Sequence, residues 1–356
     1  MKVVLVELGA THHEVLIPQL KLLKNSNVEV ELCLSEKFIK NNLDPVAFEG
    51  VKVIPVKSFN KNLAGLYKTL KLSKKLNSLN PDWVIFNTVA GPQLSLLSRS
   101  LKKSIKQAGI VHNTKKISKS KSVRSVCKRL KRIIVLNREL LNWIPDFKEK
   151  GFCFYPLTKA PHESSSDTSG NALKVVIPGQ VETKRRDYHF LLEQIKKIPD
   201  SLDVTFSFLG NAYHEKGSGK ELEVLLKDIP KRFGIKLLDK PVSEEEFRKE
   251  ILSSDLILPL ITPTCDGFEN YLRYQISGTY NLSFSLKKPM MIHEAFSGFK
   301  DFMETSIIYS SSNFVEKLDE VAKNRSFLKF LETKLRSENL WKEEEISRSY
   351  LAMLSS

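Results

Sequence analysis

The order of hydrophobic and polar positions along this chain predicts strands that alternate with helices. Residues 2–9 form an apolar, largely β-branched run, the pattern of a strand buried on both faces, and helical apolar spacing follows at 12–26. The alternating segment 28–35 completes a β-α-β unit. Similar patterns recur through the first half, at 51–56, 63–79, 81–88, 108–114 and 131–144. This alternation is typical of a doubly wound parallel sheet.

A second series of the same kind begins after a change of composition. Residues 157–171 are mostly small and polar and lack apolar periodicity, which predicts a linker. Beyond the linker, strands are predicted at 172–179, 202–210, 234–239, 255–261 and 289–292, and helices between them at 187–198, 221–233, 243–254 and 278–288. We therefore expect two Rossmann-like α/β domains, 1–156 and 172–330, and a helical tail at 331–356 that could pack back on the first domain. Two such domains would face one cleft lined by strand-to-helix loops, because ligands of open α/β sheets bind at the carboxyl ends of the strands.

Charge and cysteine usage narrow the classes of function. The 356 residues include 56 Lys and Arg against 41 Asp and Glu, a formal charge of +15, which favours a polyanionic partner. The four cysteines are too scattered for a disulfide scaffold or a zinc site. No apolar run approaches the ~20 residues of a transmembrane helix, and the N-terminal apolar stretch is too short for a secretory signal. We therefore expect a cytoplasmic protein.

Two loops of the second domain are candidate phosphate sites. In "IPGQVETKRRDYHF", Gly179 lets the chain turn after its strand, and Lys184, Arg185 and Arg186 lie near the start of the next helix, where backbone N–H groups favour anions. A run of three basic residues is also common on a solvated surface, and that interpretation stays open.

The second loop opens the segment "ISGTYNLSFSLKKPMM". Gly278 permits close backbone approach, while the hydroxyls of Ser277 and Thr279 are donors at the start of a predicted helix. A plain Ser or Thr helix cap, which needs no ligand, is the alternative. We favour a ligand because both loops follow strands of one domain and could converge on one diphosphate.

These segments, with "LILPLI" between them, resemble the nucleotide-sugar-binding half of GT-B glycosyltransferases, especially bacterial enzymes similar to glycosyltransferase family 4. The resemblance implies the GT-B fold, with the donor diphosphate held by Lys184 and Arg185 or Arg186 and by the 277–279 loop. Retaining members of that family usually carry two glutamates eight positions apart, and the corresponding places here hold Tyr274 and Leu282. Glu269 lies nearby without such a partner, so the stereochemical outcome and the ribose-binding residue stay open.

Candidate acceptor-side residues follow strands of the first domain. In "GATHHEV", His13 and Glu14 could serve as the general base that deprotonates an acceptor hydroxyl, and a polar helix start is the alternative. His112, at the end of "GIVHNT", resembles the strand end at which family members set a histidine near the donor sugar. A structural histidine is the alternative there.

The first domain contains a basic segment at residues 102–138, called here the basic belt. No Asp or Glu occurs from residue 83 to 138, and residues 102–138 contain thirteen Lys or Arg. Within it, "KKISKSKSVRSVCKRLKR" has apolar positions in partly helical spacing, which suits an interfacial helix on an anionic membrane. Its membrane or acceptor candidates are Lys115, Lys116, Lys119, Lys121, Arg124, Lys128 and Arg129. The belt lacks the interleaved aromatic residues of single-strand binders, which argues against nucleic acid.

The sequence thus predicts a metal-independent glycosyltransferase with no cofactor beyond its nucleotide-diphosphate-sugar co-substrate. Its acceptor would be a glycan or lipid-linked glycan of surface polysaccharide assembly, met at the inner face of the membrane. Two alternatives stay open. One is a sugar-nucleotide epimerase of the same architecture, and the other is a non-catalytic basic protein that binds membrane or nucleic acid.

Overall fold

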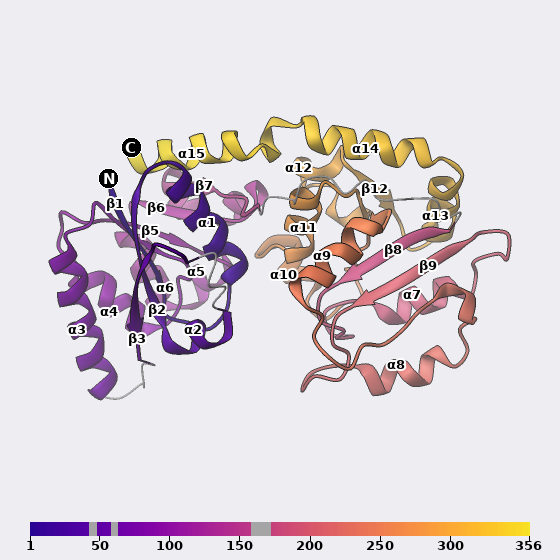
Figure 1. The fold of residues 1–356 in the computed structure, drawn as a ribbon, viewed down its shortest axis with the longest axis horizontal. Coiled ribbons are helices and arrows are strands. Elements are labelled where there is room, and N and C mark those ends of the chain that lie inside the picture. The colour runs from indigo at the N-terminus through magenta and orange to yellow at the C-terminus, as the bar shows by residue number, and fades with distance from the viewer. Residues whose placement is uncertain (43–47, 58–62, 158–171) are drawn as a thin grey trace. The chain divides into compact units, whose positions relative to one another are not determined.

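The computed structural model describes residues 1–42, 48–57, 63–157 and 172–356, which form two compact units. Unit 1 comprises Met1–Pro156, Arg273–Gln275 and Glu343–Ser356, and unit 2 comprises the rest of the described chain. The predicted linker lies outside the described residues except for Leu157. Figure 1 shows an α/β fold in both units.

Unit 1 is built on a seven-stranded parallel sheet of order β3-β2-β1-β4-β5-β6-β7. The strands are β1 (Lys2–Glu7), β2 (Glu29–Ser35), β3 (Lys52–Val56), β4 (Trp83–Phe86), β5 (Lys106–Ile110), β6 (Arg132–Val135) and β7 (Gly151–Cys153). In the central register, Leu5 lies opposite Leu32 on one side and Ile85 on the other, and all three are fully buried. The predicted doubly wound sheet is confirmed.

Helices cover both faces of this sheet (Figure 1). One face carries α3 (Leu63–Leu79), α4 (Pro92–Ser100) and α6 (Lys121–Arg129), of which α4 packs against both of the others. The other face carries α1 (His13–Asn25) and α2 (Glu36–Asn42). The remaining helical segments of unit 1 are α5 (Lys115–Lys119), the 3₁₀ turns η1 (Arg138–Trp143) and η2 (Pro145–Lys150), and α15 (Glu343–Ser355).

Unit 2 has a five-stranded parallel sheet of order β12-β11-β10-β8-β9. The strands are β8 (Leu173–Pro178), β9 (Val204–Leu209), β10 (Leu256–Ile257), β11 (Met290–His293) and β12 (Ser306–Tyr309). The connecting helices are α7 (Tyr188–Ile195), α8 (Gly219–Leu226), α9 (Glu244–Ser253), α10 (Phe268–Arg273), α11 (Gly278–Leu286) and α12 (Lys300–Met303), with short turns η3 (Lys231–Phe233) and η4 (Glu294–Phe296). Its last segments are α13 (Phe314–Lys323), α14 (Arg325–Ser337) and η5 (Asn339–Trp341).

Two strand predictions in unit 2 differ from the structure. The predicted strand at 234–239 is wrong, because this segment pairs only through the isolated bridge between Asn211 and Leu238. Its apolar side chains Ile235 and Leu237 instead pack against the core from a non-strand segment. The predicted strand at 255–261 shrinks to two residues, because Pro259 lacks an N–H donor and Leu260 has a left-handed φ of 54°.

The end of the chain divides between the units. Residues 314–342 belong to unit 2, where Trp341 stacks on Phe284 with ring centroids 3.6 Å apart. Helix α15 belongs to unit 1, where its Leu354 carbonyl accepts a hydrogen bond from the Trp83 indole at 2.9 Å. No helix of the described ranges is both long and apolar enough to span a membrane.

Candidate functional site

The loop after β8 is shaped by a glycine and an inward-facing arginine. Gly179 has φ of +99°, a conformation that side-chain-bearing residues rarely adopt. Arg186 donates from Nη2 to the Pro178 carbonyl at 2.5 Å and from Nη1 to the Gln180 carbonyl at 3.0 Å, and a Cβ at Gly179 would meet its guanidinium. Of the three predicted basic residues, Arg186 therefore braces the loop itself.

The other two basic residues of this loop face solvent. Lys184 is exposed, and Arg185 is half-exposed. Arg185 lies 4.0 Å from a carboxylate oxygen of Glu182 and donates to the Tyr271 hydroxyl at 3.4 Å. Tyr271 lies on α10, so Arg185 connects the β8 loop with the segment that leads to α11.

Asp187 fixes this loop to the one that follows β10. Its carboxylate caps α7 by accepting from the Phe190 N–H at 3.0 Å, and it also accepts hydrogen bonds from the hydroxyls of Thr262 and Thr264. Its own N–H donates to the Leu260 carbonyl at 3.0 Å. Buried Asp187 thus sets the spacing between two carboxyl-end loops of one sheet.

A half-buried histidine pairs with a buried carboxylate behind the loop. Nδ1 of His214 accepts the Lys216 N–H at 3.2 Å, so the proton of a neutral ring resides on Nε2, which lies 3.5 Å from Oε1 of Glu182. The hydroxyls of Thr183 and Ser218 also meet, at 3.0 Å. These contacts join the loops after β8 and β9.

The start of α11 combines a cap with an open glycine. The Ser277 hydroxyl accepts the Thr279 N–H at 3.4 Å, so Ser277 acts as the helix cap, and its side chain and that of Thr279 are buried. Gly278 is exposed, and a Cβ built there would meet nothing within 4 Å. Packing therefore does not require a glycine at 278, although the open first turn leaves room for a ligand.

The positions singled out by the missing glutamates lie on α10, on α11 and in the segment between them. Glu269 is an exposed residue of α10, and Leu282 is partly exposed on α11. Tyr274 belongs to unit 1, where its carbonyl accepts the Thr114 N–H at 2.8 Å and its ring packs edge-on against Trp143. None of these three side chains supplies a carboxylate pair.

In unit 1 the loops after β1 and β4 meet around a buried carboxylate. Glu7, the last residue of β1, accepts from the Gly9 N–H at 2.6 Å, from Asn87 Nδ2 at 2.8 Å and from the Thr88 hydroxyl at 2.6 Å. All three donors come from loops that follow strands, and Glu7 is almost fully buried. This carboxylate therefore organises the predicted acceptor end of the sheet.

Four titratable side chains assemble beside it. The rings of His12 and His112 stack with centroids 3.7 Å apart. His12 Nδ1 is 3.0 Å from Glu14 Oε1, and His13 Nδ1 is 3.6 Å from Glu14 Oε2. The three predicted residues His13, Glu14 and His112 thus form one cluster through His12.

The surroundings set the charge states in this cluster. Burial, with the nearby His12 as a further cause, lowers the pKa of His112 to about 4, so its ring is neutral at pH 7, and its Nε2 lies 2.8 Å from the Asn87 carbonyl. Burial raises the pKa of Glu14, but the hydrogen bond and charge of His12 outweigh it, and the net direction is downward. His112 is therefore a weak base that suits hydrogen bonding, and Glu14 is ionised.

A chain of buried polar groups runs from α15 to this cluster. Tyr350 donates to Gln19 Oε1 at 2.9 Å, Gln19 Nε2 donates to Asn87 Oδ1 at 2.9 Å, and Asn87 Nδ2 donates to Glu7. All four side chains are buried. This series of hydrogen bonds connects a helix near the C-terminus with the carboxyl end of β1.

The basic belt occupies α5 and α6 with its charges outward. Its exposed members include Lys115, Lys119, Lys121 and Lys128, whereas Arg124 pairs with Asp146 at 2.8 Å. The apolar positions of the belt are all buried in the core of unit 1, namely Ile117, Val123, Val126 and Leu130. The interpretation of this segment as an interfacial helix is therefore wrong, because its apolar face is already covered.

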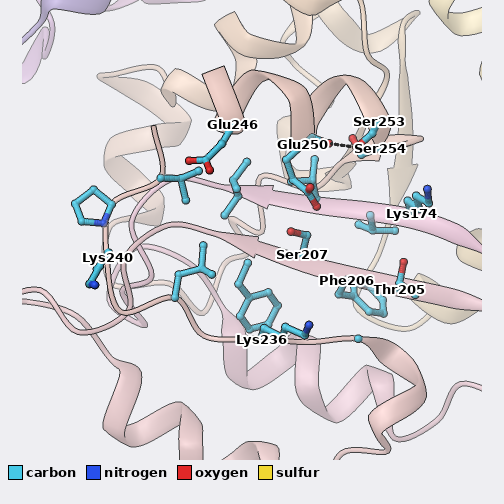
Figure 2. A pocket seen from close by; sticks show the side chains of 18 of the residues that line it. Lys174, Thr205, Phe206, Ser207, Lys236, Lys240, Glu246, Glu250, Ser253 and Ser254 are labelled. Carbon is cyan, nitrogen blue, oxygen red and sulfur yellow. Dashed lines mark hydrogen bonds between the residues drawn. The ribbon is translucent and has the colours of Figure 1, made fainter. Parts of the chain in front are cut away.

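A cavity of about 710 Å³ lies elsewhere in unit 2, over β8 and β9 and beneath α9 (Figure 2). Carboxylates of Glu246 and Glu250 and the amines of Lys174, Lys236 and Lys240 line it together, around the hydroxyl of Ser207. None of the predicted donor residues lines it. The cavity occupies the edge of the sheet where the predicted strand 234–239 fails to pair.

Comparison with solved structures places the fold. The structure of Anabaena HepE in complex with UDP matches over 100% of both chains, with a TM-score of 0.74 and 12% identity. The lipopolysaccharide outer core galactosyltransferase WaaB matches over 100% of this chain and 99% of its own, with a TM-score of 0.68 and 12% identity. The UDP-GlcNAc 2-epimerase from Neisseria meningitidis, bound to UDP-GlcNAc, covers 100% of both chains at a TM-score of 0.64 and 14% identity.

The chain thus has the GT-B fold, with two Rossmann-like units. No protein-family model and no curated protein sequence matches it. Across the part of the chain that the structure describes, no cluster of three or more His, Cys, Asp or Glu side chains could hold a metal ion.

The site contains residues that sequence reasoning missed. Glu7 lies inside the first predicted strand, where a single carboxylate among apolar residues was the available signal. Asp187 directly follows the basic run and precedes a helix, which is the position of a helix cap. The pairing of Glu182 with His214 had no local signal, because the two residues come from different loops.

Proposed function

We propose that this protein is a glycosyltransferase that moves a sugar from a nucleotide-diphosphate-sugar to a glycan or lipid-linked glycan acceptor. The observation that carries the proposal is the carboxyl edge of the unit 2 sheet. There, exposed Lys184 and Arg185 follow β8, and α11 begins at Gly278, where an added Cβ would meet nothing within 4 Å. Asp187 fixes the β8 loop to the loop after β10, and Arg185 reaches Tyr271 on the way to α11. The likeness of fold to UDP-bound HepE supports the same proposal.

The charge arrangement suits the leaving group of such a reaction. When the bond between the sugar's anomeric carbon and the diphosphate oxygen breaks, negative charge grows on the diphosphate. Lys184, Arg185 and the N–H groups of the first turn of α11 would stabilise that charge, in place of a metal ion. Arg186 acts by holding the shape of the loop. The acceptor oxygen forms the new bond to the anomeric carbon and gives up its proton.

The cluster in unit 1 would act on the acceptor. Glu14 and His13 are the candidate proton acceptors, since both are half-exposed and lie at the first turn of α1. Neutral His112 would hydrogen-bond a sugar hydroxyl without adding charge. Glu7 and Asn87 hold the loops that carry these groups, and they are positioning residues.

The exposed lysines of the belt would hold the enzyme at the cytoplasmic face of a membrane. Each Lys or Arg near an anionic surface contributes ~1 kcal/mol, so even part of the belt would suffice for peripheral binding. We place its work in surface polysaccharide assembly, where acceptors are carried on lipid.

A panel of nucleotide-sugars tests the proposal. The purified protein is incubated with UDP- and GDP-sugars, with and without a glycan acceptor, and release of nucleoside diphosphate is followed. We expect acceptor-dependent release with one donor class, and loss of release in Lys184→Ala. Absence of both turnover and binding across the panel would contradict the proposal.

An epimerase is the second candidate, favoured by the full-length match to the Neisseria meningitidis enzyme. An epimerase converts the sugar of the donor without an acceptor. Conversion of a UDP-sugar in the absence of any acceptor, followed by NMR of the sugar ring, would favour this candidate over transfer.

A further inference from the structure

Three large apolar side chains of α3 are exposed, whereas the other exposed ones in the described part of unit 1, Met1 and Trp143, lie singly on other segments. Leu66, Tyr67 and Leu70 are 45%, 69% and 40% exposed. Their spacing of one and four residues places them on one face of the helix, while Leu72 and Leu76 face the core. Scattered exposed leucines are ordinary, but three large apolar side chains on adjacent positions form a patch that calls for a partner.

Lysines continue the same face toward the C-terminal end of the helix. Lys71 and Lys74 follow Tyr67 and Leu70 by four residues, and Lys75 follows Lys71 by four. All three are exposed, and no described carboxylate pairs with them. The helix contains no Asp or Glu. Its outer surface is therefore apolar in its first half and positively charged in its second.

The position of α3 in unit 1 joins this patch to the basic belt. Helix α4 packs between α3 and α6, so α3 belongs to the same layer as the helix that carries Lys121 and Lys128 (Figure 1). The belt supplies charge without apolar groups, since its own apolar residues are buried. The first turns of α3 also follow the carboxyl end of β3, the edge of the sheet at which Glu7 and His112 lie.

We propose that α3 docks on an anionic lipid surface, with Leu66, Tyr67 and Leu70 inserted at the boundary between head groups and acyl chains. Lys71, Lys74 and Lys75 then pair with lipid phosphates. A tyrosine beside leucines suits this boundary, because its ring is apolar and its hydroxyl reaches water. The inference rests on the proposed function, because a lipid-linked acceptor would be met at this surface. Its test uses only substitutions in α3 and needs no substrate.

Other occupants fit the patch less well. A second copy in a two-fold contact would bring two sets of the three lysines together, and like charges repel. A single-stranded nucleic acid would need several stacking aromatic rings, whereas the patch offers one. An anionic bilayer matches both the apolar and the charged half.

Vesicle binding of the full chain tests the inference without any substrate. Co-sedimentation is measured with vesicles of phosphatidylcholine alone and with about a third phosphatidylglycerol, a composition chosen to give a strongly anionic surface. We expect binding to the anionic vesicles only. The triple variant L66S/Y67S/L70S should lower the partition coefficient roughly tenfold or more, because three apolar groups no longer enter the lipid. The triple variant K71S/K74S/K75S should lower it by a similar factor.

The matched control is Val224→Ser, which removes an exposed apolar side chain from α8 of unit 2 and should leave vesicle binding unchanged. Circular dichroism of each variant checks that it folds. A Tyr67→Trp variant should also show quenching by lipids brominated along the acyl chain.

Four results would overturn the inference. They are vesicle binding that survives both triple variants, failure of the wild type to bind anionic vesicles, light scattering that shows an α3-dependent dimer, and binding of single-stranded DNA in place of vesicles. If the wild type binds anionic vesicles but turns over no nucleotide-sugar, the proposed enzyme activity is contradicted and the membrane inference is not.

Discussion

Arg186 shows that a basic side chain beside a candidate phosphate loop can serve the loop itself. Its guanidinium bonds two carbonyls across the turn at Gly179, while the neighbouring Lys184 is exposed. The sequence treats the three basic residues alike, because no local pattern tells which side chain turns inward. The structure gives Arg186 a role in the shape of the loop and leaves Lys184 exposed to solvent.

The different environments of Arg186 and Lys184 predict that one substitution lowers stability and the other lowers affinity for UDP. Arg186→Met removes charge-assisted hydrogen bonds to two carbonyls and should lower the free energy of unfolding by about 1.5–3 kcal/mol. Lys184→Ala, at an exposed position, should change that free energy by less than about 0.5 kcal/mol but weaken UDP binding. Urea unfolding and calorimetric titration measure the two quantities. Equal losses of stability in both variants would show that Arg186 has no bracing role.

Half-buried His112, whose pKa is lowered mainly by burial, predicts a dependence of stability on pH. Its pKa of about 4 in the folded protein lies below its ordinary value of 6.5, so the unfolded state binds more protons between these two values. The contribution of neutral His112 to the free energy of unfolding is complete above about pH 6.5 and is lost as the pH falls toward 4. The expected loss is about 2 kcal/mol between pH 8 and pH 5.

The measurement compares urea unfolding of wild type and His112→Gln at pH 8 and pH 5. The variant should lose less stability than the wild type over this range. The control is His189→Asn, which removes an exposed histidine of unit 2. If the free energy of unfolding changed equally with pH in wild type and His112→Gln, the lowered pKa of His112 would be contradicted.

At the scale of elements, α15 is joined to unit 1 by more than its apolar face. Tyr350 begins the buried chain through Gln19 and Asn87 to Glu7. In this way a helix near the end of the sequence orders the loop residues around the cluster of His12, His13, Glu14 and His112. The link passes between residues 331 positions apart in sequence, so no local pattern could predict it.

Removing this link should have a measurable cost. Tyr350→Phe leaves Gln19 Oε1 without its buried donor and should lower the free energy of unfolding by about 1–3 kcal/mol. Tyr213→Phe is the matched control, because the Tyr213 hydroxyl meets Glu223 at an exposed position and its loss should cost little. Urea unfolding measures the loss of free energy of unfolding in each variant. Equal losses in the two variants would contradict a structural role for the hydrogen bonds that begin at Tyr350.

The elements themselves were largely predictable, since burial on both faces of a parallel strand leaves a continuous apolar run. The strand at Lys2–Glu7 and the helix at Leu63–Leu79 follow the hydrophobic pattern closely. The errors have local causes. The segment 234–239 has an apolar pattern but lies in a non-strand conformation against the core, and Pro259 ends β10 early. Strands as short as Gly151–Cys153 carry too few residues for periodicity to detect.

At the scale of the whole molecule, sequence pattern and structure agree on the GT-B fold, whose two Rossmann-like units match HepE at 12% identity. A fold of this kind is set by periodicity over many residues, whereas chemistry depends on a few side chains brought together by long-range pairing. The sequence singled out two loops of unit 2 but not the carboxylates Asp187 and Glu182, which fix the first of these loops to the loops after β10 and β9.

The central claim is that a diphosphate binds at the carboxyl edge of unit 2 beside Gly278. Calorimetric titration of UDP into wild type, Gly278→Leu and Gly298→Leu tests it most directly. A Cβ added at either glycine would meet no other atom within 4 Å, so neither change should disturb folding. We predict that UDP binds wild type and Gly298→Leu alike and that Gly278→Leu loses at least about tenfold in affinity, because its side chain fills the path to the N–H groups of α11. Equal affinity of all three proteins, or no binding of UDP or GDP to any of them, would contradict the claim.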